Sequence, residues 1–366
     1  MTWLVTGGAG YIGGHVVRGL QAAGQRVVVL DDLSNGSACR VPLGVPLIVA
    51  DVADPRAVRA VIRAHAVSGV VHLAARKSVS ESVRRPAFYY RENVGGLLSV
   101  LAAMSDTGVD RLVFASSAAV YGAPAGPVVA ETAAVLPMNP YGHSKLTGER
   151  ILAAIGDHEG LSWVALRCFN VVGTASAALV DRHGDNVLPR LIEAADTGQV
   201  FTIAGGDHST RDGTGVRDYV HVVDVAAAFA AAALRLSTGP SLRIVLNVGS
   251  GQGYSVLELI DCVELVTGRR VRYRVGPARP GDPPEVTADP ALIGRTLRWQ
   301  ARHRLPDMAG SAWRGRTPGA DPIRPPEPNL PLQITHRGTV VLGGSHLPET
   351  SRPRQMDWRT TWTSSL

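Results

Sequence analysis

Short apolar runs alternate with amphipathic stretches through the first half of the chain. Apolar runs rich in β-branched residues predict strands at 3–6, 26–30, 46–49, 69–73 and 111–116. The apolar spacing between these runs predicts helices at 15–23, 56–65 and 88–104. Strands that alternate with helices favour an α/β fold with a doubly wound parallel sheet. Ligands of such sheets bind beyond the carboxyl ends of the strands, so we expect the functional residues directly after each run.

The second half of the chain is less regular and predicts a smaller second domain. Residues 224–236 predict a helix and residues 244–248 a strand, and both would return to the first sheet. We therefore expect a nucleotide-binding domain made of 1–170 and 217–248, and a substrate-binding domain made of 171–216 and 249–316. In the latter, residues 305–313 have the apolar spacing of a packed helix. The Pro-rich composition of 317–366 predicts a linker or a disordered tail.

A glycine-rich turn joins the first predicted strand to the first predicted helix. Gly7, Gly10 and Gly13 would let the backbone approach a pyrophosphate, and the following helix would offer free N–H groups and the positive end of its dipole. Asp31 ends the second strand, about 20 residues further on, where a carboxylate suits a ribose diol and disfavours a ribose phosphate. The spacing therefore predicts a dinucleotide site that prefers NAD to NADP.

Tyr141 and Lys145 lie four residues apart, so on a helix their side chains share one face. A phenol titrates near pH 10, and a neighbouring ammonium would favour the phenolate, which is the form a base needs. Lys77 and Lys145 are the only lysines among the 37 Lys and Arg residues, which suggests that both positions require a compact ammonium. Ser117, after the strand at 111–116, is the hydroxyl best placed to bond a reacting oxygen. The alternatives are that Tyr141 and Lys145 lie on a solvated helix face, and that Ser117 belongs to an ordinary turn.

Composition narrows the range of functions. Hydrophobic residues make up 45% of the chain and charged residues 19%, as in an ordinary globular enzyme. No apolar run is long enough to span a membrane, and no secretory leader is recognisable, so we expect a cytoplasmic protein. The three cysteines are widely separated and lack the spacing of metal ligands, so we expect core thiols and no metal. The net charge of +6 comes from scattered arginines, which favours an anionic small molecule over nucleic acid.

Several motifs together resemble the UDP-glucose 4-epimerases of the extended short-chain dehydrogenase/reductase family, over about residues 1–316. They are the glycine turn, the segments 116–122 and 141–145, and the stretches 167–170, 212–222 and 247–251, of which 212–222 is the most specific. The resemblance implies a Rossmann-type sheet, bound NAD, a UDP-sugar substrate and a homodimer. It implies catalytic roles for Ser117, Tyr141 and Lys145. It implies NAD contacts from Gly7, Gly10, Tyr11, Ile12, Gly13, Asp31, Asn35, Asp51, Val52, Lys77, Asn93, Tyr141 and Lys145. It implies substrate contacts from Ser117, Asn170, Asn186, Val187, Arg217, Arg279 and Val286.

The chemistry of the substrate residues agrees with this resemblance. Two guanidinium groups from separate segments, Arg217 and Arg279, can pair with the two phosphate charges of a UDP-sugar. The alternatives are a structural ion pair between Arg217 and Asp218, and a solvated turn at Arg279. Asn170 follows a strand that is expected to be buried, so its amide must find partners, and a structural cap is its alternative role.

Two further positions refine the expected reaction, which is the reversible inversion of carbon 4 of a UDP-hexose through a 4-keto intermediate. In the related nucleotide-sugar dehydratases, the residues at these positions resemble Asp-Glu, whereas this chain has Ala118 and Ala119. The site therefore lacks an acid and a base for removing water. Val286 matches a position that borders the pocket for the 2-substituent of the sugar, where a small side chain resembles enzymes that also admit N-acetyl sugars. A plain surface valine is its alternative. The other functions left open are epimerisation of UDP-N-acetylhexosamines or UDP-uronic acids, and nucleotide sensing without catalysis.

Overall fold

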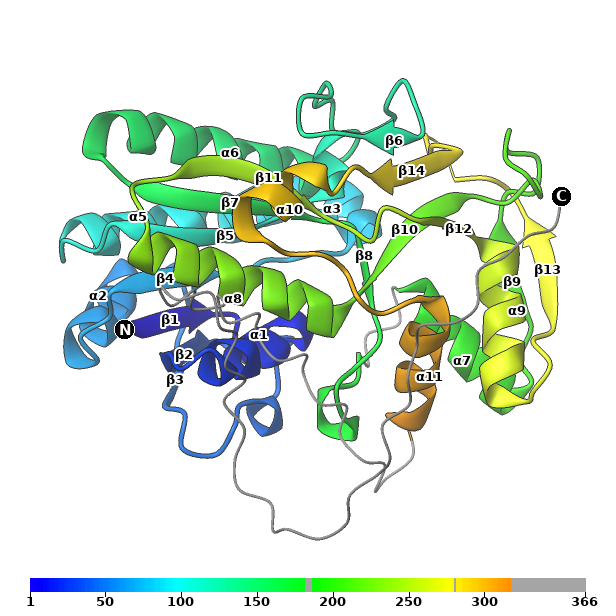
Figure 1. The fold of residues 1–366 in the computed structure, drawn as a ribbon, viewed down its shortest axis with the longest axis horizontal. Helices are drawn as coiled ribbons and strands as arrows, with labels where there is room; N and C mark the ends of the chain where they lie inside the picture. Colours follow the sequence, from blue (N-terminus) through cyan, green and yellow to red (C-terminus); the bar gives the residue numbers. More distant parts are fainter. Residues whose placement is uncertain (182–185, 280, 317–366) are drawn as a thin grey trace, which may run out of the picture. The chain divides into compact units, whose positions relative to one another are not determined.

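A seven-stranded parallel sheet organises the first part of the molecule (Figure 1). The computed structural model describes residues 1–181, 186–279 and 281–316, and its sheet order is β11-β7-β5-β4-β1-β2-β3. The strands are β1 (Thr2–Thr6), β2 (Arg26–Asp31), β3 (Leu47–Val49), β4 (Gly69–His72), β5 (Arg111–Ser117), β7 (Ser162–Cys168) and β11 (Arg243–Val248). From β1 the strands continue through β2 and β3 on one side, and from β4 through β5, β7 and β11 on the other. The strand ends at β1 and β4 therefore form the crevice that doubly wound sheets use for ligands.

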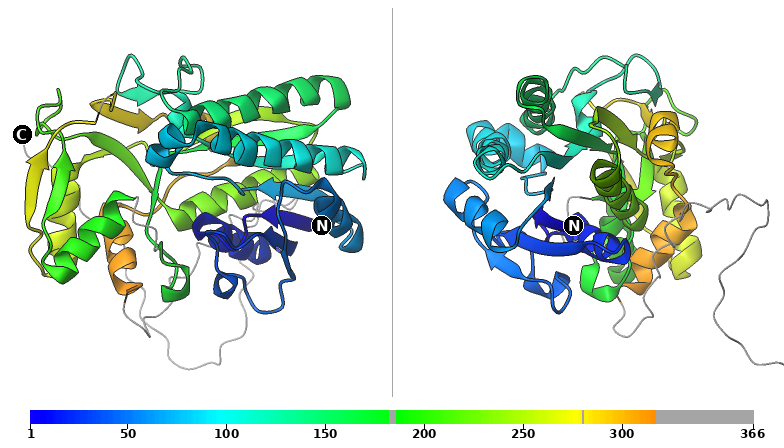
Figure 2. Two further views of the ribbon diagram at one scale, coloured as in Figure 1. Left: turned by 180° about the vertical axis from the view of Figure 1, so that it is seen from behind. Right: turned by 60° about the vertical axis from the view of Figure 1, so that its left-hand side comes forward.

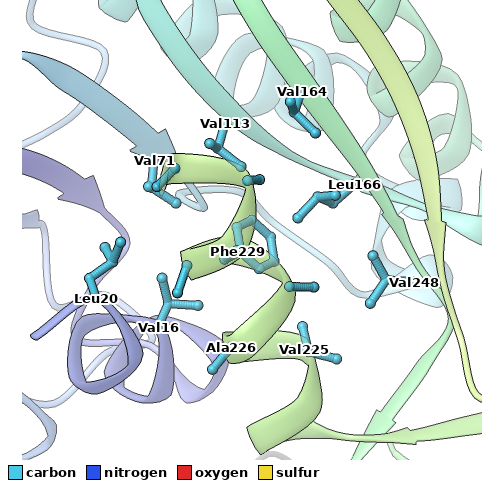
Figure 3. Close-up of a cluster of buried hydrophobic side chains, with 14 of the residues drawn as sticks. Val16, Leu20, Val71, Val113, Val164, Leu166, Val225, Ala226, Phe229 and Val248 are labelled. Atoms are coloured by element: carbon cyan, nitrogen blue, oxygen red, sulfur yellow. The ribbon is translucent and has the colours of Figure 1, made fainter. Parts of the chain in front are cut away.

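Helices cover both faces of this sheet (Figures 1 and 2). One face carries α1 (Tyr11–Ala22), α8 (Val222–Thr238) and α10 (Ala291–Leu297), whose apolar side chains share one buried core with the sheet. Figure 3 shows Phe229 of α8 in this core, near Val113 of β5 and Leu166 of β7. The opposite face carries α2 (Pro55–Ala64), α5 (Gly96–Ser105) and α6 (Pro140–Glu159), which enclose a second core.

A second, smaller sheet has the order β12-β10-β14-β6, and β8 also pairs with β10. Its strands are β6 (Val128–Val129), β8 (Asn170–Val172), β10 (Val216–His221), β12 (Gly253–Ser255) and β14 (Glu285–Ala288). Two further strands, β9 (Phe201–Ala204) and β13 (Tyr273–Gly276), pair with each other. The helices α7 (Val187–Thr197), α9 (Val256–Thr267) and α11 (Leu305–Arg314) pack into a third core beside β9 and β10.

Short helical segments complete the described chain. They are α3 (Val79–Arg84), α4 (Pro86–Tyr90), the π-helical turn η2 (Arg91–Gly95), and the 3₁₀ turns η1 (Ala38–Arg40), η3 (Ala118–Val120) and η4 (Ala177–Leu179). The helix expected at 88–104 is therefore three consecutive segments, with a π-helical turn in its middle.

The α/β class and the doubly wound parallel sheet are confirmed. The strands expected at the seven-stranded sheet lie within one or two residues of the observed ones, and the expected helix at 305–313 is α11. The second sheet joins β6, from the first half of the chain, to β14, from the second half, and β10 lies in this sheet although we placed 217–248 in the nucleotide-binding domain. The two-domain division stays a prediction. The tail predicted at 317–366 lies outside the described residues.

Candidate functional site

A cavity of about 810 Å³ opens at the carboxyl ends of β1, β2, β4, β5 and β7. This volume is within the range of sites for cofactors and other small molecules. It is lined by most of the predicted site residues: Gly7, Gly10, Tyr11, Ile12, Gly13, Asp31, Asn35, Asp51, Val52, Lys77, Ser117, Tyr141, Lys145, Asn170, Asn186, Arg217, Arg279 and Val286. The structure thus brings together, in one cavity, residues that span 280 positions of the sequence, from 7 to 286.

The glycine turn after β1 is so tight that only glycine fits at two of its positions. Gly7 has a φ of +73°, and a Cβ atom there would lie 2.7 Å from the backbone nitrogen of Ala74. A Cβ atom on Gly13 would lie 2.0 Å from the carbonyl oxygen of Gly7. Helix α1 begins directly after Gly10, and no side chain caps it. The bare helix N-terminus therefore faces the cavity as a place for an anion such as a pyrophosphate.

Asp31 lies at the end of β2, beside this turn, and is buried. Its Oδ2 accepts a hydrogen bond of 2.9 Å from the backbone of Ala9, and its Oδ1 accepts one of 2.8 Å from Leu33. Burial raises the pKa of this carboxyl, and the two backbone hydrogen bonds oppose that shift. Each carboxylate oxygen keeps a second lone pair, so Asp31 can fasten the turn and still accept from a ribose hydroxyl. The glycine cradle, the open helix end and this acid fit NAD.

Ser117, Tyr141 and Lys145 meet where β5 ends and α6 begins. Helix α6 starts after Asn139, whose side chain accepts from the backbone N–H of Gly142 at 2.9 Å, and Pro140 occupies the first helical position. This cap places Tyr141 in the first turn and Lys145 one turn further on. The Ser117 hydroxyl lies close enough to lower the pKa of the Tyr141 phenol, and the Nζ atom of Lys145 lies 6.0 Å from the centre of the Tyr141 ring.

The electrostatics of this trio differ from our expectation that Lys145 lowers the Tyr141 pKa. Burial raises the pKa of the Tyr141 phenol, and the opposing influence is its hydrogen bond with Ser117. Burial also lowers the pKa of Lys145 to about 8. The physical reason is that both heads are withdrawn from water in the same pocket, which disfavours the charged form of each. The hydroxyl of Ser117, rather than the ammonium, is the group that stabilises the phenolate here.

The two arginines predicted to hold a diphosphate line the far end of the cavity. Arg217, on β10, forms an ion pair with Asp282 and donates to the carbonyl oxygen of Val216 at 2.7 Å. The alternative pair with Asp218 is wrong, because the Asp218 carboxylate points away and accepts from the backbone of Ser250, Gly251 and Ala288. Arg279 lines the same end of the cavity.

Three other substrate candidates also line the cavity. The strand before Asn170 is buried as expected, but Asn170 itself, at the start of β8, is exposed, so the expectation that its amide must find structural partners is wrong. Its side chain faces the cavity and has no hydrogen bond to another residue of the described chain. Asn186 immediately precedes α7 and donates from its amide to Asp181. Val286, on β14, is 7% exposed and is the register partner of Arg217. Since it is buried in the cavity wall, Val286 is not a surface valine.

Two predicted contacts do not line the cavity. Asn93 is buried in the π-helical turn, where its Oδ1 accepts from the backbone N–H of Arg76 at 2.7 Å and its Nδ2 donates to Ser144 at 2.9 Å. It therefore fastens the loop after β4 to α6. Val187 begins α7 and packs against the third core. An apolar side chain at a helix start is better satisfied by that core than by a polar ligand, which explains its place.

Arg76, a candidate because it follows a predicted strand, lines the cavity between Glu92, at 3.4 Å, and Asp32, at 3.7 Å. One feature of the site was missed. Glu149 and Arg167 form a buried ion pair at 2.7 Å behind the catalytic trio. The signal there was a charged residue, Arg167, near the end of a largely apolar strand, since a buried charge requires a partner.

Within the described residues, no group of three or more His, Cys, Asp or Glu side chains has the arrangement of a metal site. None of the helices in that part of the chain has the length and apolar character needed to cross a membrane.

The parallel sheet, the glycine cradle at its switch point and the acid at the end of β2 define a dinucleotide-binding protein with a Rossmann-type fold. The chain belongs to the NAD dependent epimerase/dehydratase family, whose model matches residues 3–249.

Known proteins similar to this chain agree with that placement. A UDP-glucose 4-epimerase from Azospirillum brasilense is 41% identical over 315 residues, which cover 84% of this chain and 90% of that protein. The structure of a UDP-glucose-4-epimerase from Stenotrophomonas maltophila, with bound NAD and formylated UDP-arabinopyranose, matches with a TM-score of 0.83 at 42% identity, covering 86% of this chain and 98% of that one. The UDP-Glc/GlcNAc 4-epimerase of Campylobacter jejuni matches with a TM-score of 0.76 at 32% identity, covering 86% and 98%.

Proposed function

We propose that this protein is an NAD-dependent enzyme that interconverts UDP-glucose and UDP-galactose by inverting carbon 4. The observation that carries the proposal is that Ser117, Tyr141 and Lys145 line the same cavity as a dinucleotide cradle at one end and Arg217 and Arg279 at the other. Many relatives that match over most of the chain are UDP-glucose 4-epimerases, which supports the same activity.

Tyr141 is the residue we assign to proton transfer at the sugar 4-hydroxyl. Its phenol must be deprotonated to act as a base, and the Ser117 hydroxyl stabilises the resulting phenolate. Bound NAD supplies a hydride acceptor and the positive charge of its nicotinamide. Lys145 is 5% exposed and faces Tyr141 in the cavity, so its ammonium is suited to hold the ribose hydroxyls beside the nicotinamide.

Arg217 and Arg279 are the residues we assign to the diphosphate. Arg217 must exchange its ion pair with Asp282 for charge-assisted hydrogen bonds to phosphate. Inversion at one carbon requires the hydride to return to the opposite face of the sugar. The diphosphate must therefore stay bound while the sugar rotates within the cavity.

The residues after Ser117 favour epimerisation over elimination. Ala118 and Ala119 form the 3₁₀ turn η3 and line the cavity, where a dehydratase would need an acid and a base. Methyl groups cannot transfer protons, so the keto sugar would keep its remaining hydroxyls.

A direct assay tests this function. Purified protein should convert UDP-glucose to UDP-galactose, and the reverse, without any added reductant, because the redox change is returned within one turnover. Tight binding of NAD and UDP without turnover of any UDP-sugar would instead favour the nucleotide-sensing regulator. Turnover of UDP-uronic acids alone would show that the reaction is right and the hexose is wrong.

A second substrate class is favoured by Val286. A tyrosine at this place in the cavity wall would fill the space beside the sugar, whereas valine leaves room for an acetamido group. Exclusion by a ring is a stronger discriminator than the 1–3 kcal/mol, roughly, that an apolar pocket gains per methylene. We therefore expect turnover of UDP-N-acetylglucosamine, and we expect Val286→Tyr to remove it while sparing UDP-glucose. If the wild type converts UDP-glucose briskly and the N-acetyl sugar not at all, Val286 does not set the pocket width.

We also propose that the protein acts as a cytoplasmic homodimer. Tyr90 at the end of α4 and Leu98 on α5 are 39% and 48% exposed, so these helices offer apolar side chains to a partner. Analytical ultracentrifugation of the wild type and of Leu98→Glu tests this assembly. A monomeric wild type would contradict it.

A further inference from the structure

A row of polar side chains crosses three neighbouring strands directly behind the catalytic trio. Ser116 on β5 is the register partner of Arg167 on β7, and Arg167 is the register partner of Asn247 on β11. All three are buried, with exposed fractions of 4%, 5% and 0%. Side chains of successive strand residues point to opposite faces, and Phe114 and Ala165, two residues earlier, belong to the core under α5 and α6. The row therefore faces α6.

Helix α6 contributes a single carboxylate that contacts this row. Glu149 is 5% exposed and lies one helical turn after Lys145. Its Oε1 accepts from the hydroxyl of Ser116 at 2.5 Å and from Nε of Arg167 at 2.9 Å, while its Oε2 accepts from Nη2 of Arg167 at 2.7 Å. The geometry is a two-pronged arginine–carboxylate pair with one additional hydroxyl bond.

The other end of the row is tied to the segment that follows Ser117. Arg167 also donates from Nη1 to the hydroxyl of Tyr121 at 2.9 Å, and Tyr121 donates to Oδ1 of Asn247 at 2.6 Å. The backbone N–H of Asn247 donates in turn to Glu131 at 2.7 Å. Tyr121 ends the 3₁₀ turn that begins right after Ser117, so the network holds this turn in place.

The consequence is mechanical. Tyr141 and Lys145 sit on α6, Ser117 follows Ser116 directly, and Glu149 bridges the helix to the strand. We propose that Glu149, through its pair with Arg167, is a positioning residue that sets the distance between Ser117 and Tyr141. This inference rests on the proposed function, because it assigns Glu149 a role in that reaction. Glu149 touches neither substrate nor cofactor, since it lies outside the residues that line the cavity.

Replacement of the carboxylate by an amide tests the role. In Glu149→Gln, the amide nitrogen faces Arg167, so the helix and the strand must shift apart. A misplacement of about 1 Å costs roughly 10²-fold in turnover. We expect kcat to fall by about 10-fold to 10²-fold with KM for UDP-glucose little changed. Loss of the Ser117 bond raises the Tyr141 pKa, so the acid limb of the pH–rate profile should also move to higher pH.

A matched control separates positioning from stability. Asp224, 1% exposed, is also a buried carboxylate with several donors, among them the backbone N–H and the ring of His303 at 3.0 Å each. It lies at the start of α8, away from the trio. Asp224→Asn should lower the melting temperature and leave kcat and the acid limb in place. If both variants lose kcat in proportion to their melting temperatures, the role of Glu149 is structural only.

A double variant keeps the test decisive if Glu149→Gln folds poorly. Apolar residues of similar size often replace a buried ion pair without loss of stability. Glu149→Leu combined with Arg167→Met should therefore fold, yet it lacks the bonds to Ser116 and Tyr121. We expect a melting temperature close to wild type with kcat still reduced. Recovery of both kcat and the acid limb would overturn the positioning role. An inactive wild type would contradict the proposed function itself, which is a different outcome.

Discussion

The two ends of the cavity are built in different ways. At the dinucleotide end, the shape is set by backbone that has no space to change: a Cβ on Gly13 would meet the Gly7 carbonyl, and Asp31 is held by two backbone N–H groups. At the sugar-nucleotide end, the groups that would bind ligand are engaged with neighbouring side chains, as Arg217 is with Asp282 and Asn186 with Asp181.

This difference suggests that the two ends of the cavity have different roles. A rigid cradle costs little reorganisation when a ligand binds, so it suits a cofactor that stays in place. Exchangeable polar pairs can release one partner for another, so they suit a substrate that enters, turns and leaves. The catalytic trio lies between the two, with Tyr141 carried by α6 and Ser117 by the end of β5.

The largest expected effect comes from breaking the rigid end. Gly13→Ala puts a methyl group 2.0 Å from a carbonyl oxygen, so the turn after β1 must deform. We expect loss of NAD binding, and destabilisation above about 4 kcal/mol, as measured by calorimetric titration and chemical unfolding. Gly126→Ala is the control, because nothing lies within 4 Å of the Cβ it adds. Normal NAD affinity in Gly13→Ala would show that the cradle is not rigid.

The next largest effect should come from the group between the two ends. Tyr141→Phe removes the proton-transfer group and keeps the ring, so turnover should fall roughly 10²-fold to 10⁴-fold. The dinucleotide cradle is untouched, so the purified variant should carry as much NAD as the wild type. Near-normal turnover would refute the role of Tyr141, whereas loss of NAD would show that the two regions are not independent.

A smaller effect, with opposite signs in two variants, is expected at the exchangeable end. Arg217→Met removes charge-assisted bonds worth about 1.5–3 kcal/mol each, so UDP affinity should fall by roughly 10-fold to 10²-fold. Asp282→Asn releases Arg217 from its ion pair and should tighten UDP binding modestly. Titration of both variants with UDP measures the contrast. If Asp282→Asn weakens binding as much as Arg217→Met does, the pair acts as a fixed unit and the two ends do not differ.

Acid should act on the rigid end, where buried histidines are neutral. Burial lowers the pKa of His15 to about 4 and that of His72 to about 3. Each depressed pKa means that the unfolded chain binds a proton that the folded chain refuses. Stability is therefore fully present above pH 6.5 and is lost as the pH falls toward these values, by about 1 kcal/mol per pH unit for each histidine. Unfolding at several pH values should show a shallower slope in His72→Gln and an unchanged slope in the control His143→Gln.

Local sequence signals were enough to predict much of the fold and the rigid end. Apolar runs placed the strands of the seven-stranded sheet because each is short and bounded by turns and most are buried. The glycine spacing predicted the cradle because only glycine tolerates that geometry. The second sheet was not predicted, since β6 and β14 lie more than 150 residues apart and pair over only two residues of β6.

The failures at the site have a common cause. The Arg217 partner, the burial of Asn93 and the direction of the Tyr141 pKa all depend on which distant groups meet in space. Spacing along one helix brought Lys145 near Tyr141, but it could not show that both heads are withdrawn from water. Sequence patterns thus identified the residues of the cavity better than they predicted the charges of those residues.

The central claim is that hydrogen leaves carbon 4 as hydride and returns to the same carbon inside a closed site. The most direct measurement uses UDP-glucose that carries deuterium at carbon 4, with the wild-type enzyme in ordinary water. The account predicts that the UDP-galactose formed retains the deuterium at carbon 4. Replacement of that deuterium by solvent hydrogen would show inversion through a carbanion, and would contradict the account.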